Sequence, residues 1–244
     1  MAQSDSDPTQ NIFNISGSSI TNIVGSGTIH HTEANQNTPP LESDKQVILF
    51  LAAQPFTTAR LRLDEEIREI EAGLRRSKYR DRFQLEQQWA VRPRDLQRAM
   101  LDHNPQIVHF AGHGIGRSTT ESTRKFSPID QPMSEGLILE DETGQPKLIS
   151  TEALAAWFKL FSKTVECVVL NACYSEVQAN AIAQHIPYVI GMQSAIGDRA
   201  AIEFSIGFYD ALGAGESIQR AYDFGVLSIR MAGIPEHLIP RLLA

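Results

Sequence analysis

The sequence predicts an α/β protein with a doubly wound, mostly parallel sheet, helices on both faces and one β-hairpin insertion. From Lys45 onward, short runs rich in Val, Ile and Leu alternate with amphipathic helical patterns. Two of the runs, 106–113 and 166–173, end in small residues and one reactive side chain. A further stretch, 136–149, has alternating residues around a central turn, which indicates a hairpin.

The first half of this pattern begins with the apolar strand 47–52 (VILFLA). A helix is expected over 58–74, because apolar residues recur there at near-helical spacing among charges. These residues are Leu61, Leu63, Ile67, Ile70 and Leu74. Segment 83–91 predicts a more polar strand at a sheet edge, and Pro93 opens a helix that runs to about His103.

The second half continues after strand 106–113 with the hairpin, whose turn is expected from Asp141 to Gly144. Ser150 or Thr151 can cap a helix that ends near Phe161. The remaining elements are expected in chain order as strand 166–173, helix 177–185, strand 188–192, and helices 198–213 and 216–231. This alternation predicts parallel strands, and ligands of such sheets bind beyond the carboxyl ends of the strands.

Composition predicts one domain over 41–244 and a low-complexity tail over 1–40, because the chain has 244 residues with 42% apolar content. A net charge of −7 argues against nucleic acid as a partner. No stretch approaches the roughly 20 apolar residues that span a bilayer, so no membrane partner is expected. The first ten residues lack signal-peptide features. Cys167 and Cys173, about 20 Å apart on one strand, are too far apart for a disulfide, which favours a cytoplasmic protein.

The tail contains an imperfect repeat, in which Asn, Ile, Gly and Ser of 14–20 recur about eight residues later in 22–29. Segment 11–29 has no charged residue and no proline. One interpretation is a disordered polar tail. The other is a self-assembly motif over 11–31, because uncharged Asn/Ser/Ile stretches can stack in register.

His113 and Cys173 are the candidate catalytic residues. Each lies seven residues past the first residue of its strand segment, 106–113 or 166–173. If the two strands are neighbours and start level, the imidazole and the thiol emerge side by side at one edge of the sheet. That arrangement is typical of a Cys-His nucleophilic dyad. A following helix is expected to favour the Cys173 thiolate through its amino end.

Each candidate also has a structural interpretation, as a core thiol or a hydrogen-bonded core histidine. Small neighbours favour catalysis at His113, where Gly114 and Cys173 can offer backbone N–H groups to an oxyanion. Cys167, near the start of its strand, is assigned to the core. His109 is assigned a structural role, because on a strand its ring would lie about 13 Å from that of His113. Without a further His, Cys or Asp cluster, neither a zinc site nor a cofactor is expected.

Asp198 follows the strand at 188–192, at the same sheet edge. It can cap the helix that begins there. It can also bind a basic substrate side chain at the mouth of the site, and the two roles are compatible if each carboxylate oxygen takes one.

These motifs resemble the CHAT domains, caspase-like cysteine peptidases related to separases and caspases. The resemblance covers most of residues 45–235. It lies in the segments HFAGHG (109–114), GLIL (136–139) followed by LIS (148–150), LNAC (170–173) and GMQSAIGD (191–198), with AIEF (201–204) and FY (208–209) after them. It implies a caspase-like fold, with His113 as general base and Cys173 as nucleophile. By analogy with separases, it also implies that Asp198 binds a basic residue before the cleaved bond.

Two positions depart from that pattern. Glu176 stands where many relatives have glycine, and Asn171 stands where metacaspase-like enzymes have an acidic residue. Basic specificity would then rest on Asp198 alone.

The tail loosely resembles amyloid-signalling motifs, in particular at Ile23-Val24-Gly25. The two resemblances together imply an intracellular cysteine endopeptidase, an effector of a bacterial defence or regulated cell-death pathway that is activated by tail assembly. Its expected partners are a protein or peptide substrate, an upstream sensor or receptor with a matching motif, and further copies of itself. The long polar loop 115–133 is expected to become ordered only in the active state. The alternatives are a catalytically silent adaptor with the same fold and a hydrolase or acyltransferase of another class using the same dyad.

Overall fold

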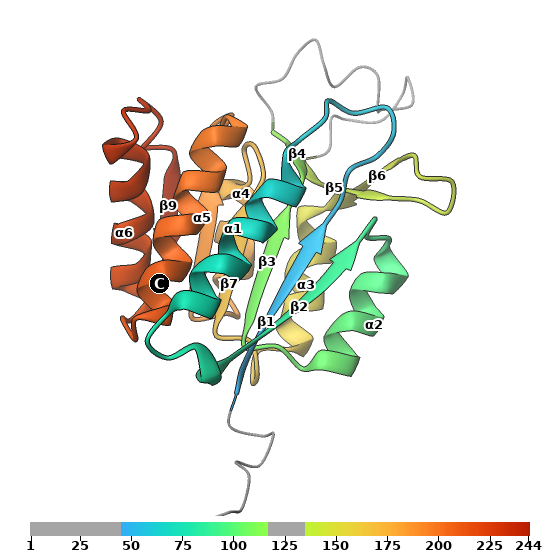
Figure 1. The fold of residues 1–244 in the computed structure, drawn as a ribbon. Coiled ribbons are helices and arrows are strands. Elements are labelled where there is room, and N and C mark those ends of the chain that lie inside the picture. The colour runs from blue at the N-terminus through green and yellow to red at the C-terminus, as the bar shows by residue number, and fades with distance from the viewer. Residues whose placement is uncertain (1–44, 117–134) are drawn as a thin grey trace, which may run out of the picture. The chain divides into compact units, whose positions relative to one another are not determined.

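A six-stranded sheet lies at the centre of the fold (Figure 1), in the order β2-β1-β3-β7-β8-β9. The computed structural model describes residues 45–116 and 135–244, all within one unit, 40–244. The tail motif and most of the polar loop lie outside the described residues. The strands are β1 Gln46–Ala52, β2 Phe83–Trp89, β3 Ile107–Ala111, β7 Cys167–Asn171, β8 Tyr188–Met192 and β9 Pro240–Leu243. Five run parallel, and β9 pairs antiparallel with β8.

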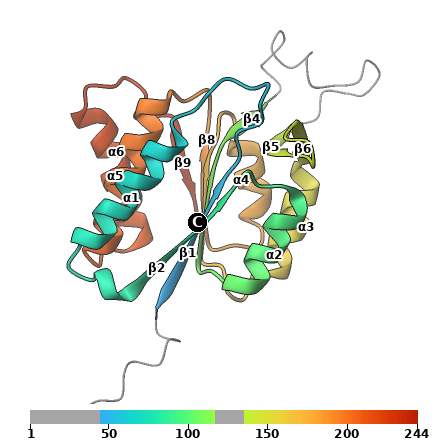
Figure 2. The same cartoon turned by 45° about the vertical axis from the view of Figure 1, so that its right-hand side comes forward.

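Helices cover both faces of this sheet, as Figure 2 shows from the side. One face carries α1, α5 and α6, and the other carries α2, α3 and α4. The helices are α1 Leu63–Arg76, α2 Pro93–His103, α3 Thr151–Leu160, α4 Glu176–Ile182, α5 Asp198–Gly213 and α6 Ile218–Met231, with a short 3-10 helix at Arg80–Arg82. The fold is therefore the doubly wound, mostly parallel α/β arrangement that the alternating pattern predicts.

The sheet separates two apolar cores, because alternate residues of each buried strand face opposite sides. Ile48 and Phe50 of β1 pack toward α1 and α5, whereas Leu49 and Leu51 pack toward α2 and α3. All five residues of β3 and all five of β7 are buried. These central strands consequently fix the position of the residues that follow their carboxyl ends.

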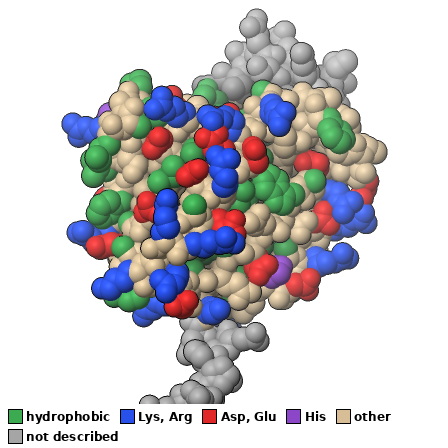
Figure 3. Space-filling view, in the orientation of Figure 1, with side chains coloured by type: hydrophobic (Ala, Val, Ile, Leu, Met, Phe, Trp, Pro, Cys, Tyr) green, Lys and Arg blue, Asp and Glu red, His purple; other side chains and the backbone are tan. Residues whose placement is uncertain are grey.

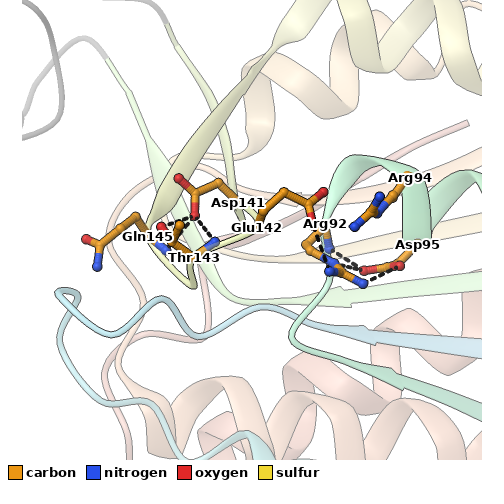
Figure 4. Close-up of polar contacts among 7 residues, drawn as sticks. All are labelled: Arg92, Arg94, Asp95, Asp141, Glu142, Thr143 and Gln145. Atoms are coloured by element: carbon orange, nitrogen blue, oxygen red, sulfur yellow. Dashed lines mark hydrogen bonds and ion pairs between the residues drawn. The ribbon is translucent and has the colours of Figure 1, made fainter.

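A second, three-stranded antiparallel sheet contains β4 His113–Ile115, β5 Gly136–Glu140 and β6 Pro146–Ser150. The expected hairpin is confirmed, with the Gly144 amide donating to the Asp141 carbonyl and Gly144 at a φ of +76°. The Asp141 carboxylate accepts from the amides of Thr143 and Gln145 (Figure 4).

The turn is also tied to the start of α2. Glu142 forms ion pairs with Arg92 and Arg94, and Arg92 pairs in addition with Asp95 of the same helix (Figure 4). The hairpin and α2 are therefore linked by side chains as well as by the chain.

Most expected elements are found near their predicted bounds, and three differences matter. α1 begins at Leu63 rather than at position 58, because hydrogen bonds of Gln54 hold a loop before it. The segment expected as one strand, 106–113, breaks at Gly112, and His113 starts β4 in the other sheet. The prediction that α6 ends the chain is wrong, because β9 follows it and covers the β8 edge.

Candidate active site

The ends of β3 and β7 bring His113 and Cys173 to the same level. The two strands are parallel neighbours, and Ala111 at the end of β3 pairs with Asn171 at the end of β7. His113 and Cys173 each lie two residues further along the chain. The expectation that the two strands are neighbours in level register is therefore confirmed.

A pocket lies at this edge of the sheet, with an empty volume of about 380 Å³ including its open mouth. His113, Cys173 and Asp198, which are separate in the sequence, all line it. The rest of the lining comes from the start of α1 and its preceding loop, the ends of β3 and β7, and the start of α5.

A backbone carbonyl orients the His113 ring. Nε2 of His113 lies 2.8 Å from the carbonyl oxygen of Ala59, in the loop between β1 and α1. A carbonyl oxygen only accepts, so Nε2 carries the proton and donates it. In the neutral ring Nδ1 is then the unprotonated nitrogen, which is the one that can act as a base.

The Ala59 carbonyl is itself held in place by Gln54. The Gln54 side-chain amide donates to Ala59 at 2.9 Å and to the Thr58 hydroxyl at 3.0 Å, and its oxygen accepts from the Leu61 amide at 2.8 Å. One side chain therefore shapes the loop that sets the imidazole orientation. Gln54 and Ala59 were not identified from the sequence, since nothing in the loop sequence indicates which carbonyl faces the histidine.

Burial shifts the pKa of each member of the candidate pair in the direction that favours its neutral form. Burial raises the pKa of the Cys173 thiol, and the nearby charges of Asp198 and Glu236 add to the effect. Burial also lowers the pKa of His113 below 6.5. The Cys173 thiol donates toward the Ile196 carbonyl at 3.7 Å, as a protonated sulfur does. The expectation of a thiolate favoured by a helix amino end is wrong, because α4 starts only at Glu176 and desolvation dominates.

The chain turns sharply directly after the cysteine. Tyr174 has a φ of +57°, an uncommon conformation for a residue with a side chain. The buried Ser175 hydroxyl donates to the Leu170 carbonyl at 2.8 Å and accepts from the Met192 amide at 2.9 Å. Ser175 therefore joins the ends of β7 and β8 behind the turn that presents Cys173.

Gly114, the candidate oxyanion donor, lies in β4 in close contact with this turn. A Cβ atom added to Gly114 would lie 2.2 Å from the Cys173 carbonyl oxygen. Only glycine fits at this distance. The backbones that carry the two candidate N–H groups, those of Gly114 and Cys173, are therefore neighbours.

Asp198 lies at the first position of α5 and is half-buried in the pocket wall. The helix cap is Gly197, and no side chain provides a capping hydrogen bond. The capping interpretation of Asp198 is therefore wrong. Burial raises the pKa of Asp198, although the backbone and charge of Arg62 oppose the shift. The Gly197 amide donates to Glu236 at 2.7 Å, which places a further carboxylate near the site that sequence reasoning missed.

The two residues assigned to the core lie there. Cys167 is fully buried, and burial raises the pKa of its thiol far above that of an exposed cysteine. His109 is also fully buried, stacks on Phe50 at 5.0 Å between ring centres and contacts the Tyr209 hydroxyl at 3.1 Å through Nδ1. Neither faces the pocket.

Several known proteins are similar to this chain. A "Probable protease" of Gillisia limnaea is 22% identical over 167 residues, which is 68% of this chain and 26% of that protein, so the chain spans about a quarter of its relative. A secreted C11 cysteine protease of Bacteroides thetaiotaomicron, in complex with an irreversible peptide inhibitor, matches with a TM-score of 0.50 and 13% identity over 77% of this chain and 59% of that chain. A second structure of a secreted C11 cysteine protease from that organism has a TM-score of 0.45 and 12% identity, over 73% and 61% of the two chains.

The likeness to the inhibitor-bound protease confirms the predicted caspase-like α/β fold. The sequence itself matches the family described as "CHAT domain" over residues 25–231, which is most of the chain. The protein therefore belongs to the CHAT domain family.

Proposed function

We propose that the protein is a caspase-like cysteine endopeptidase in which His113 and Cys173 form the catalytic dyad. The observation that carries the proposal is their meeting in one pocket, each two residues beyond a paired position of neighbouring strands. The names of the similar proteins, a probable protease and a C11 cysteine protease, support the same reaction class. Nucleophilic acyl transfer requires a nucleophile, a base and a space for the substrate. The thiol, the imidazole with its fixed tautomer and the pocket at the carboxyl ends of the strands meet these requirements.

The proposed reaction has two stages. Nδ1 of His113 takes the thiol proton as the Cys173 sulfur bonds to the peptide carbonyl carbon, and the Gly114 and Cys173 amides stabilise the resulting oxyanion. The C–N bond then breaks, and the leaving amine takes the proton from His113. Water, deprotonated by His113, hydrolyses the thioester and releases the acid. Asp198 at the pocket wall binds a basic side chain of the substrate.

The test compares the wild-type chain, Cys173→Ala and Cys167→Ala on a mixed peptide library, with cleavage sites identified by mass spectrometry. We expect cleavage after Arg or Lys by the wild type and by Cys167→Ala, and none by Cys173→Ala. Cleavage that survives in Cys173→Ala would contradict the proposed nucleophile. Cleavage after other residues would retain the dyad and rule out Asp198 as a binder of basic side chains.

We further propose that residues 1–40 form a separate assembly segment and that 41–244 form the peptidase domain, an effector in bacterial defence or regulated cell death. Support comes from the repeat in the tail and its resemblance to amyloid-signalling motifs. Clustering of tails would raise the local concentration of the domain and promote its activation. Deleting residues 1–40 should abolish the concentration dependence of cleavage. Unchanged activity at every concentration would contradict activation by the tail.

A catalytically silent adaptor is the second candidate, and the neutral, half-buried Cys173 thiol favours it. An electrophilic arginyl peptide distinguishes the two. Labelling of Cys173 but not of the buried Cys167 supports the enzyme. If neither thiol is labelled, even after forced assembly of the tails, the adaptor is favoured.

A further inference from the structure

Helix α1 buries a carboxylate in the wall of the pocket. Glu66 is only 3% exposed, although its neighbours in the first turn, Asp64 and Glu65, face outward. It lines the same pocket as His113 and Cys173. An ionised carboxylate in such a position is costly unless it is paired, so its partners show what it is built to bind.

The hydrogen-bond donors to Glu66 are a side-chain amide and a hydroxyl, and both bind the same oxygen. Oε1 of Glu66 accepts from the Asn171 side-chain amide at 2.6 Å and from the Ser205 hydroxyl at 2.7 Å. Nε2 of His109 lies 3.0 Å from the same oxygen but outside hydrogen-bonding geometry. Among the described residues, no Lys or Arg pairs with Glu66, and none hydrogen-bonds to Oε2.

Asn171 adds a second unmet acceptor to the same wall. Its NH2 group donates to Glu66 and, at 3.3 Å, to the Ala201 carbonyl, and these two acceptors fix the orientation of the amide. The opposite atom, Oδ1, is therefore the acceptor, and it is buried without a partner. Asn171 is 5% exposed, lines the pocket and lies two residues before Cys173.

The charges around the pocket favour a cationic ligand. Glu66 and Asp198 both line it, and the charge of Glu66 contributes to the raised pKa of Asp198, so the two carboxylates share one environment. The one basic residue in the lining, Arg62, has a side chain that is 55% exposed and pairs with Glu65. The wall therefore presents the Glu66 carboxylate, which matches the N–H donors of a guanidinium or an ammonium group.

We propose that Glu66 determines substrate specificity, by binding the guanidinium or ammonium group of the residue before the cleaved bond. The inference rests on the proposed peptidase function. It makes the buried carboxylate of Glu66 a second contact for the substrate cation, beside that of Asp198. Asn171 holds the carboxylate in position by donating to its Oε1 atom.

The competing explanation is that Glu66 only stabilises the buried polar cluster with Asn171, Ser205 and His109. Glu66→Gln separates the two explanations, because glutamine keeps an oxygen acceptor for Asn171 and Ser205 but removes the charge. Two variants serve as controls. Asp64→Asn removes an exposed carboxylate from the same helix turn, and Ser205→Ala removes a partner of Glu66 while leaving its charge.

The experiment uses the full chain and two peptides that differ only before the cleaved bond, one with arginine and one with its neutral isostere citrulline. We expect Glu66→Gln to reduce the ratio of kcat/KM for arginine over citrulline about 10- to 100-fold, without lowering the citrulline value. Asp64→Asn should keep the ratio. Ser205→Ala should keep it too, even where its melting temperature falls. An unchanged ratio in folded Glu66→Gln would overturn the inference while leaving the peptidase intact.

A binding arm separates the inference from the reaction itself. If the wild type cleaves neither peptide, the proposed function fails, and binding of the arginine and citrulline peptides to Cys173→Ala, with and without Glu66→Gln, decides the inference alone. The inference is supported if Cys173→Ala prefers the arginine peptide and the double variant does not. It is overturned if the double variant keeps the preference, or if Cys173→Ala itself shows none. If Glu66→Gln does not fold, a structure of Cys173→Ala with the arginine peptide replaces it. The guanidinium must then lie within hydrogen-bonding distance of Glu66, and any other location overturns the inference.

Discussion

At the scale of single residues, the protonation of the Cys173–His113 pair determines the chemistry. The pKa of the thiol lies above its usual value and that of the imidazole below 6.5, so both groups are neutral over a broad range of pH. In the proposed reaction, the sulfur must then lose its proton to His113 during the attack rather than before it. Such a pair acts by general base catalysis, in contrast to a thiolate–imidazolium pair.

The pH dependence follows directly. Because a protonated His113 cannot accept the thiol proton, kcat/KM should rise with pH through a midpoint below 6.5. Because the thiol pKa is raised, alkylation of Cys173 by iodoacetamide should be slow at pH 7 and still be rising above pH 9. Peptide mapping by mass spectrometry, with Cys167 as the buried control, measures the rate. An alkylation rate that is constant from pH 5 to 8 would instead indicate a preformed ion pair.

Gly114 gives a second prediction at this scale. In Gly114→Ala the new Cβ would collide with the Cys173 carbonyl at 2.2 Å, so the turn carrying the nucleophile must shift. We expect activity to fall at least about 100-fold, since catalytic geometry tolerates displacements of less than about 1 Å. Gly233→Ala is the control, because its Cβ would enter open space. Its φ of +71° should lower stability modestly without affecting kcat.

At the scale of elements, the β1–α1 loop connects the hairpin to His113, the proposed general base. The Phe56 amide donates to the Gly144 carbonyl at 3.1 Å, and the Gln54 amide donates to Glu140 at 3.0 Å. The same loop presents the Ala59 carbonyl to His113. The hairpin, itself tied to α2, therefore supports the orientation of the imidazole through one backbone carbonyl and one side-chain carboxylate.

Gln54→Glu tests this connection, because glutamate still accepts from the Leu61 amide but cannot donate to Ala59. We expect kcat to fall about 10-fold with little change in KM, since the orientation of the base is affected and substrate contacts are not. Gln184→Glu, an exposed change of the same charge on the opposite face, should leave both constants unchanged. An equal loss in the two variants would point to net charge rather than to His113 orientation.

The same elements show where sequence reasoning works. The bounds of α2, 93–103, and α5, 198–213, agree with prediction, because Pro93 marks one start and α5 follows a strand and a small-residue loop. β9 was missed because a four-residue strand carries too little periodicity to distinguish it from a loop. The equal segment lengths predicted that His113 and Cys173 lie at the same level if their strands are level neighbours, and the structure confirms that pairing.

Glu66 was missed for a different reason, since a charged residue on an amphipathic helix is assigned by default to the solvent face. The available signal was spacing, because Leu63, Glu66, Ile67, Ile70 and Leu74 all lie on one face of α1, and all are buried. A carboxylate within the apolar face of a helix therefore indicates a candidate site residue, as a histidine at a strand end does.

At the scale of the whole molecule, the candidate site draws on parts of the chain that are far apart in sequence. Glu66 comes from α1, His113 from β4, Cys173 from the end of β7 and Asp198 from α5. On the face shown in Figure 3, Lys and Arg side chains are interspersed with Asp and Glu. Among the described residues, no helix is long and apolar enough to cross a membrane.

Strand β9 forms the edge of the six-stranded sheet next to β8. β9 pairs with Val189 to Met192 of β8, and removal of residues 240–244 would leave that apolar edge unpaired. We expect a lower melting temperature and concentration-dependent association, because open strand edges pair with one another. Light scattering coupled to size exclusion measures the association. Leu238→Ser, which changes an exposed apolar residue beside the strand, should remain unchanged in both measurements.

The Ala59 carbonyl has a consequence for the response to ionic strength. Its dipole holds His113, and within residues 45–116 and 135–244 no ion pair that dissolved salt could screen takes part in orienting this proposed base. The proposed recognition of basic substrates, in contrast, depends on charge, in part on the half-buried Asp198. Added salt should therefore raise KM for basic peptides while leaving kcat constant, so that steady-state kinetics over a salt series separates the two functions of the pocket.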